Sequence, residues 1–180
     1  MNAIGRPKLS HVGISVHDLH HMREFYCGVF GFVVSDEGCG TAMPVKLVFL
    51  TADPEMHHQL VLAAGRPADA TFSTVNQLSF TVADLDELRN VKQRLIEHGA
   101  SDVRGISHGN AWSIYVKDPE LNTIEVYLDT PFYVPQPHFD LSLTDDEILE
   151  QTRKACELDA GFMLREDWQQ RIARQLEKAF

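Results

Sequence analysis

The residues with the clearest potential for chemistry are polar groups that occupy related places in two similar halves of the chain. His11 and Gln77 open the two halves, and Glu125 lies near the end of the second. A histidine and a carboxylate that face one cavity with a third donor resemble the open facial site that holds Fe(II) or another divalent ion. We therefore interpret His11, Gln77 and Glu125 as candidate metal ligands, and Gln59 as a candidate for a fourth.

Glu125 is set apart from the other candidates by its surroundings. It interrupts the apolar alternation of the run TIEVYL, from Thr123 to Leu128. A buried carboxylate requires a cation or several hydrogen-bond donors to offset the loss of hydration. The sequence therefore predicts a cation or a polar network around this side chain.

A shift of 66 positions (77 minus 11) relates the two halves of the chain. The shift places His11 on Gln77, and it also places Gln59 on Glu125. Each copy therefore begins and ends with a polar residue that can offer a metal ligand. Identical pairs under this shift include Val16 with Val82, Asp18 with Asp84 and Leu19 with Leu85.

Each half is expected to fold as a strand, a helix and three further strands. Apolar and polar residues alternate from residue 9 to 16, which is typical of a strand. Asp18 is expected to cap the following helix and Gly31 to end it. In the first half, further strands are expected at residues 32–35, 46–51 and 57–64, with a loop at 37–43. In the second half, we expect strands at 77–82, 111–117 and 123–128, a short strand or loop at 102–106, and a helix that ends at Gly99.

These elements predict an α+β fold of two βαβββ modules that form a curved mixed sheet around a central cleft. Module one is expected at residues 9–64 and module two at 75–134, joined by a linker at 65–74, within one domain of residues 1–134. The first and last strands of each module should lie together, with their polar faces toward the cleft. This arrangement predicts that His11, Gln77 and Glu125 meet in space.

Residues 135–180 are expected to form a proline-rich connection and a helical C-terminal extension. Thr144 and Glu147 have the spacing of a capping box at the start of a first helix. Trp168, Ile172 and Leu176 recur at intervals of four residues, which predicts a second helix with an apolar face. We expect this extension to serve packing or oligomerisation, because its apolar face must be buried.

Composition argues against several classes of partner. The 180 residues carry a formal net charge of −10, which disfavours binding to nucleic acid or to an anionic membrane surface. No apolar run is long enough to span a membrane, and the N-terminal residues lack the apolar segment of a signal peptide, so we expect a cytoplasmic protein. The three cysteines are expected to be reduced thiols, because no CxxC pair is present. A small molecule is the more natural partner.

The repeated unit, with His11 in one copy and the run from Asp118 to Glu125 in the other, resembles the vicinal oxygen chelate superfamily. This superfamily includes glyoxalase I, bleomycin-resistance proteins, fosfomycin-resistance enzymes and type I extradiol dioxygenases. The resemblance covers about residues 8 to 134. The runs His57 to Leu62, Ser107 to Gly109 and Ser113 to Tyr115 are most similar to the small one-domain extradiol dioxygenases, which cleave catechols next to the paired hydroxyls.

That resemblance implies an Fe(II)-dependent ring-cleaving dioxygenase with a small aromatic substrate and dioxygen as partners. It implies metal ligation by His11, Gln77 and Glu125, and catalytic roles for His58, His108 and Tyr115. His58 corresponds to the acid–base histidine, and His108 and Tyr115 to residues that hydrogen-bond the bound catecholate. Because modules of this fold commonly pair, a homodimer or higher homo-oligomer is expected.

Gln77 departs from the dioxygenase pattern, which has a histidine at this position. An amide oxygen is a harder and weaker donor than imidazole, so we expect either a lower affinity for iron or a shift of preference among divalent metals, with Mn, Ni or Zn as alternatives to Fe(II). A glyoxalase-like metal-dependent lyase or isomerase with Gln59 as a fourth ligand is therefore an alternative. A metal-free small-molecule binding protein of the same fold is another.

Overall fold

The structure, a computed structural model, describes residues 7–41, 44–70, 72–133 and 142–178. The first module contains β1 (Val12–Val16), α1 (Leu19–Phe30), β2 (Val33–Cys39), β3 (Lys46–Thr51) and β4 (Leu60–Ala64). The second contains β5 (Leu78–Thr81), α2 (Leu85–Glu97), β6 (Ser101–Ser107), β7 (Ala111–Lys117) and β8 (Thr123–Asp129). Two helices follow, α3 (Asp145–Glu157) and α4 (Arg165–Lys178).

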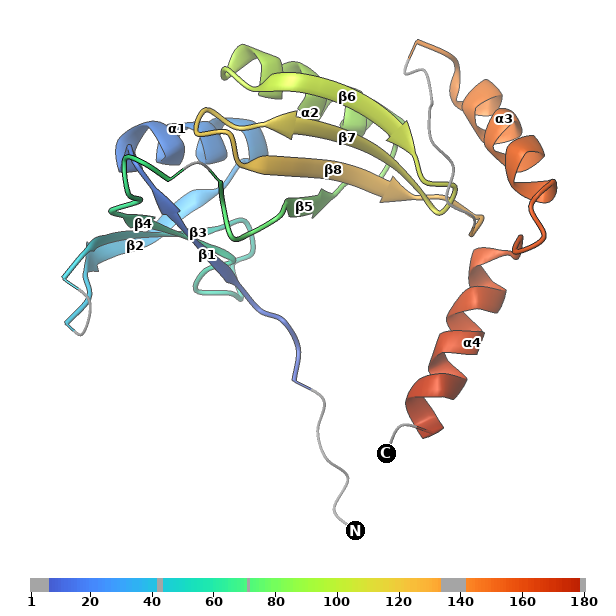
Figure 1. Ribbon diagram of the computed structural model, residues 1–180, viewed down its shortest axis with the longest axis horizontal. Coiled ribbons are helices and arrows are strands. Elements are labelled where there is room, and N and C mark those ends of the chain that lie inside the picture. The colour runs from blue at the N-terminus through green and yellow to red at the C-terminus, as the bar shows by residue number, and fades with distance from the viewer. Residues whose placement is uncertain (1–6, 42–43, 71, 134–141, 179–180) are drawn as a thin grey trace.

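Each module forms its own four-stranded mixed sheet (Figure 1). The strand order is β1-β4-β3-β2 in the first sheet and β5-β8-β7-β6 in the second. In both sheets the first strand runs parallel to the last, and the other neighbours are antiparallel. The predicted α+β fold of two βαβββ modules is therefore confirmed, including the pairing of first and last strands. That residues 1–134 form one domain stays a prediction.

Local signals begin and end the module helices as the sequence indicates. The side chains of Asp18 and Asp84 accept hydrogen bonds from the backbone N–H groups of His21 and Glu87, which satisfies donors that a helix start leaves unpaired. Gly31 ends α1 with a φ of 69°, a left-handed conformation that a side chain would disfavour.

The apolar face of each module helix packs on one face of its sheet and forms a shared core. The buried residues of α1 are Met22, Phe25, Tyr26 and Val29, and those of α2 are Leu85, Leu88, Val91 and Leu95. The two helices also contact each other, where Arg94 Nε donates to the Val29 carbonyl oxygen at 2.8 Å. Phe30 of α1 stacks on Phe80 of β5 with ring centroids 4.1 Å apart. The core thus joins the two modules.

The turn after β7 fastens the modules together through buried acidic groups. Tyr26 Oη donates to Asp118 Oδ2 at 2.9 Å, and burial raises the pKa of Asp118. Glu120 accepts hydrogen bonds from the backbone N–H groups of His17 and Asp18 at 2.7 to 2.9 Å. The linker residue Arg66 forms an ion pair with Glu120 at 3.7 Å, in which the side chains are only 9% and 7% exposed. These contacts set how the modules sit against each other.

Two predicted boundaries in the first module are wrong. β2 continues to Cys39, through part of the segment expected to be a loop, because its backbone stays paired with β3 as far as Lys46. β4 begins at Leu60 rather than at residue 57. The residues before it form a turn that is closed by the Gln59 N–H, which donates to the Leu50 carbonyl oxygen at 2.8 Å. β3 and β7 have the predicted bounds, and the remaining strand boundaries differ from prediction by at most three residues.

The C-terminal extension forms the two predicted helices. α3 begins with the predicted capping box at Thr144 and contacts the second module, where Trp112 Nε1 donates to Thr152 Oγ1 at 2.9 Å. α4 extends away from the two sheets (Figure 1), and Trp168 near its start stacks on Tyr133 at 4.8 Å. Pro135, Pro137 and the side chain of Leu176 lie outside the described residues.

Two expectations from composition can be compared with the described chain. Cys27, Cys39 and Cys156 are free thiols, as the sequence predicts. Within the described ranges, no helix has the length and apolar character needed to cross a membrane.

The buried ion pair between Arg66 and Glu120 gives the first prediction. Glu120→Gln is expected to lower the free energy of unfolding by about 3 kcal/mol, because it leaves a buried guanidinium without its counter-charge. The measurement is urea denaturation. The control is Glu150→Gln, which removes a carboxylate from the exposed pair with Arg153 and should cost less than about 1 kcal/mol. Equal losses in the two variants would contradict the structural role of Glu120.

Candidate functional site

Glu125 lies on β8, between β5 and β7 of the second sheet. In the backbone register it is paired with Ser79 on one side and with Tyr115 on the other. Because side chains of paired residues point to the same face of a sheet, these three converge. Glu125 is 8% exposed, so water gives its carboxylate little solvation.

Neutral donors surround the Glu125 carboxylate. Oε1 accepts hydrogen bonds from Ser113 Oγ at 2.9 Å and from Tyr115 Oη at 2.7 Å. Oε2 accepts from Ser79 Oγ at 2.7 Å and from Gln77 Nε2 at 2.8 Å. These bonds replace the water that burial removes. A polar network, one of the two surroundings predicted for this glutamate, is therefore present.

His108 adds an imidazole to the network. Its Nε2 lies 3.1 Å from Tyr115 Oη and 4.0 Å from Glu125 Oε1. The Tyr115 hydroxyl already donates to Glu125, so the imidazole donates to the hydroxyl oxygen and its proton is assigned to Nε2. Burial, together with the bond to Glu125, raises the pKa of Tyr115. The hydroxyl therefore stays protonated across the neutral range.

A cavity of about 450 Å³ opens over this network, a size that suits a small ligand. It is lined by four of the six predicted site residues: Gln77, His108, Tyr115 and Glu125. The remaining lining residues are Ser79, Asn110, Ala111, Tyr127 and Asp129. The second module alone thus assembles most of the predicted site.

His11 and His58, the other two predicted site residues, lie together in the first module. Their rings are 4.2 Å apart, and His58 Nδ1 lies 2.8 Å from His57 Nδ1. Desolvation lowers the pKa of His58, and the neighbouring His11 and His57 lower it further. Among the described residues, no hydrogen bond, ion pair or ring contact joins this pair to Glu125. The predicted meeting of His11 with Gln77 and Glu125 is not seen within one chain.

Gln59 does not occupy the place that the repeat predicts. Its Oε1 accepts a hydrogen bond from the Ala52 N–H at 2.9 Å. β1 pairs Gly13 with Val61, and β5 pairs Ser79 with Glu125, so the counterpart of Glu125 in the first sheet is Val61. The cause is a difference in length between the modules. The paired positions Val12 and Leu60 are 48 residues apart, whereas Leu78 and Ile124 are 46 apart.

The donor set around Glu125 partly suits a divalent ion. A carboxylate oxygen and the amide oxygen of Gln77 are ligands that hard divalent ions accept, although the amide would have to turn its oxygen toward the ion. Among the described residues, no three His, Cys, Asp or Glu side chains are close enough to hold a metal. One chain therefore offers two of the three predicted ligands in one place.

Two functional residues were missed by sequence reasoning. Ser79 and Ser113 each donate to Glu125, and each lies two residues from a predicted site residue, Gln77 or Tyr115. Residues two apart on a strand share a face, so the alternation of the strands carried the signal. Serine alone does not distinguish such a donor from an ordinary polar residue.

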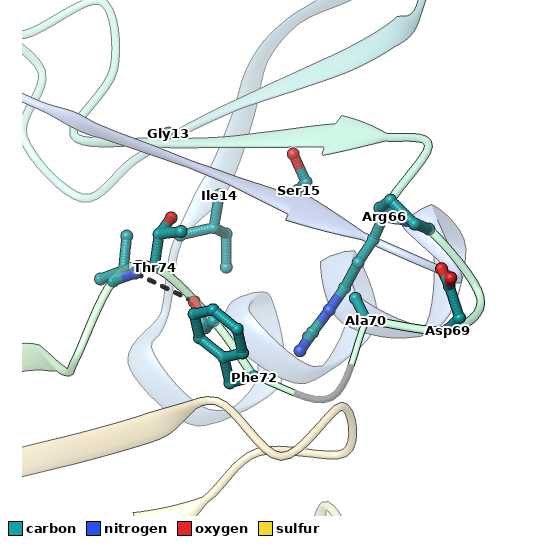
Figure 2. A pocket seen from close by; sticks show the side chains of 11 residues that line it. Gly13, Ile14, Ser15, Arg66, Asp69, Ala70, Phe72 and Thr74 are labelled. Carbon is teal, nitrogen blue, oxygen red and sulfur yellow. Dashed lines mark hydrogen bonds between the residues drawn. The ribbon is translucent and has the colours of Figure 1, made fainter.

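A larger cavity, of about 520 Å³, lies between β1 and the linker and contains none of the predicted site residues. Figure 2 shows Arg66 and Phe72 extending from the linker into the region beneath β1. The Arg66 guanidinium is held by the Glu120 carbonyl oxygen and by Asn122 Oδ1, at 3.1 and 3.2 Å. Because this charge is already paired, we place the candidate site at Glu125.

Comparison with known families identifies the fold family. Residues 8–126 match the model of the Glyoxalase/Bleomycin resistance protein/Dioxygenase superfamily. The chain belongs to this superfamily. The resemblance inferred from the repeat is thereby confirmed.

The individual relatives share less than 30% of their aligned residues with this chain. The chain is 29% identical over 126 residues to biphenyl-2,3-diol 1,2-dioxygenase 2 from Rhodococcus globerulus, a match that covers 68% of this chain and 63% of that protein. A glyoxalase/bleomycin resistance protein/dioxygenase domain from Frankia sp. EAN1pec superposes with a TM-score of 0.60 at 21% identity, over 70% of this chain and all of the other. The fosfomycin resistance protein FosX from Listeria monocytogenes, complexed with Mn(II) and sulfate, superposes with a TM-score of 0.55 at 19% identity, over 70% of this chain and 95% of the other. These two structures support the fold alone.

The bond between Tyr115 and Glu125 gives the second prediction. Tyr115→Phe should lower the free energy of unfolding by about 1–3 kcal/mol at pH 8, because the buried carboxylate loses a donor. The folded pKa of Tyr115 lies above its unfolded value of about 10, so this stabilisation is complete below pH 10 and is lost as the pH rises toward the folded pKa. Urea denaturation at several pH values between 8 and 11 measures the effect.

The matched control is Tyr127→Phe. Tyr127 lines the same cavity, and its hydroxyl makes no hydrogen bond to any residue that the structure describes. The free energy of unfolding of Tyr127→Phe should therefore equal that of the wild type below pH 10. A deficit of Tyr115→Phe that stays constant from pH 8 to pH 11 would contradict the assignment.

Proposed function

We propose that this protein is a metal-dependent ring-cleaving dioxygenase that acts on a catechol-type aromatic, with Fe(II) as its metal. The observation that carries the proposal is the buried Glu125 carboxylate, which shares one cavity with Gln77, His108 and Tyr115. The identity to a biphenyl-2,3-diol dioxygenase supports the same chemistry.

Glu125 and Gln77 would hold the metal from the second module, and His11 would supply the third ligand. Bound Fe(II) provides the redox chemistry that lets a catecholate react with dioxygen. Residues that line the cavity would orient the substrate. Tyr115 and His108 are placed to hydrogen-bond the catechol oxygens, because both line the cavity next to Glu125.

His58 would act as the acid–base group. Its lowered pKa keeps the imidazole neutral near pH 7, so that it can accept a proton. Its contact with His11 makes these two residues one half-site, and the Glu125 network makes the other. We propose that two copies of the chain associate so that the first module of one copy faces the second module of the other.

Turnover is tested with protein purified and loaded with Fe(II) under anaerobic conditions. Addition of 2,3-dihydroxybiphenyl or catechol in air should give a yellow ring-fission product. Gln77→His should tighten iron binding at least about tenfold, because imidazole is a better ligand than an amide. Iron content is measured after dialysis, and iron-loaded protein that cleaves no catechol would contradict the proposal.

Complementation tests the sharing of half-sites between copies. His11→Ala and Glu125→Ala are each expected to abolish activity. A mixture of the two variants, refolded or co-expressed, should regain about a quarter of the wild-type activity, because a random dimer contains one intact composite site in half of the molecules. No recovery in a mixture shown to contain mixed dimers would contradict shared half-sites.

The four donors to Glu125 also favour a second candidate, a metal-free small-molecule binding protein. In this network the carboxylate is satisfied by neutral groups on β7, on β5 and just before β5, and no cation is required. Failure to retain any divalent metal after anaerobic loading would support it. The glyoxalase-like alternative has less support, because the Gln59 oxygen expected to be a fourth ligand is bound to Ala52.

A further inference from the structure

A cavity of about 360 Å³ lies where the two modules meet. The first module contributes Phe30, Phe32, Ala52 and Gln59 to its lining. The second module contributes residues of β5, Val126 of β8 and one side of α2. β5 pairs only with β8, so its other edge has no strand partner in the sheet. We call this space the junction cavity.

The side chains in the junction cavity belong to the opposite face of the second sheet from the candidate site. Phe80 follows Ser79 on β5, and Val126 follows Glu125 on β8 in the same way. Successive side chains of a strand point to opposite faces, so Phe80 and Val126 lie on the face that α2 covers. Ser79 borders both cavities at the strand edge, but its hydroxyl is bonded to Glu125. A ligand in the junction cavity is therefore separate from a ligand at Glu125.

Aromatic rings from both modules form the walls of the junction cavity. Phe30 and Phe80 stack with ring centroids 4.1 Å apart, and Phe32 lies 6.1 Å from Phe80. Val82 and Val91 add aliphatic surface. Such walls suit a small aromatic ring, because rings pack favourably in offset or edge-on arrangements and apolar contact dominates binding in pockets of this kind.

Two side chains in the lining have hydrogen-bond donors to spare. Arg94 Nε donates to the Val29 carbonyl oxygen at 2.8 Å, whereas its terminal nitrogens form no hydrogen bond or ion pair with a described residue. Gln59 uses its oxygen to accept from the Ala52 N–H, and its amide nitrogen has no partner in the described part of the chain. A guanidinium and an amide N–H group together suit a carboxylate, because hydrogen bonds between charged groups are the stronger ones.

The acidic residue of the lining, Glu87, is held away from Arg94. Its Oε2 accepts from the Ala83 N–H at 2.8 Å, at the start of α2. Seven residues separate Glu87 from Arg94, which is about 10 Å along a helix. The cavity therefore keeps a positive end at Arg94.

We propose that the junction cavity is a second ligand site, and that it binds a small aromatic carboxylate. The rings of Phe30 and Phe80 would contact the aromatic part, and Arg94 with the Gln59 amide would bind the carboxylate. Such a ligand would contact both modules at once. The site is independent of the proposed dioxygenase chemistry, because it requires neither a metal nor Glu125.

Calorimetry with 3-phenylpropanoate and with the uncharged 3-phenylpropan-1-ol tests the site. The titrations contain EDTA, so their outcome does not depend on metal or on catechol cleavage. The wild type should bind the acid about tenfold more tightly than the alcohol, because only the acid pairs with Arg94. Arg94→Met should abolish this preference and leave the binding of the alcohol within about twofold. Lys92→Met is the control, because it removes a cation from the same helix outside the cavity.

A second variant keeps the Arg94 bond to Val29 intact. Gln59→Glu retains an oxygen that can accept from Ala52 but brings a negative charge into the cavity. It should therefore weaken the binding of the acid and leave that of the alcohol unchanged.

NMR spectroscopy locates the bound acid. The backbone amide signals of Val91 and Arg94 should shift on its addition, whereas those of Tyr115 and Glu125 should not. Shifts confined to Tyr115 and Glu125 would place the ligand in the candidate site and overturn the proposal. Equal binding of acid and alcohol to the wild type, or no binding of the acid, would also overturn it, whatever the outcome for the dioxygenase activity.

Discussion

Burial of the Glu125 carboxylate is the constraint that shapes the second module. A carboxylate on a central strand must receive hydrogen bonds from its neighbours, because little of it is exposed to water. The parallel pairing of β5 with β8 brings Ser79 beside it, and the antiparallel pairing of β7 with β8 brings Tyr115. The mixed sheet therefore produces a polar network from three strands, and His108 extends this network into the cavity.

The relation between the two modules depends on a second set of buried acids. Asp118 and Glu120 lie in one turn of the second module and receive hydrogen bonds from the first. Arg66, in the linker, neutralises Glu120. This attachment holds α1 against α2, and so it places Phe30 against Phe80. The core shared by the two modules is therefore a product of how the modules are joined.

The modules share a fold but differ in the chemistry of their polar faces. The first presents an imidazole pair, His11 and His58, and the second presents Glu125 with neutral donors. At the position that corresponds to Glu125, the first module has Val61. Each module thus contributes a different half of the proposed chemistry, and neither half repeats the other.

The sequence by itself determined the two βαβββ modules and the helix caps at Asp18 and Asp84, because these follow from local alternation, helix spacing and capping residues. Its motifs also resembled the superfamily to which residues 8–126 match. The sequence also predicted that the Glu125 carboxylate requires a cation or a polar network. Only the tertiary structure decided that Val61 rather than Gln59 corresponds to Glu125, since an ungapped comparison does not detect two extra residues in one module. It also decided that, among the described residues of one chain, no contact joins His11 to Glu125, because the packing between strands of different modules is encoded by no local pattern.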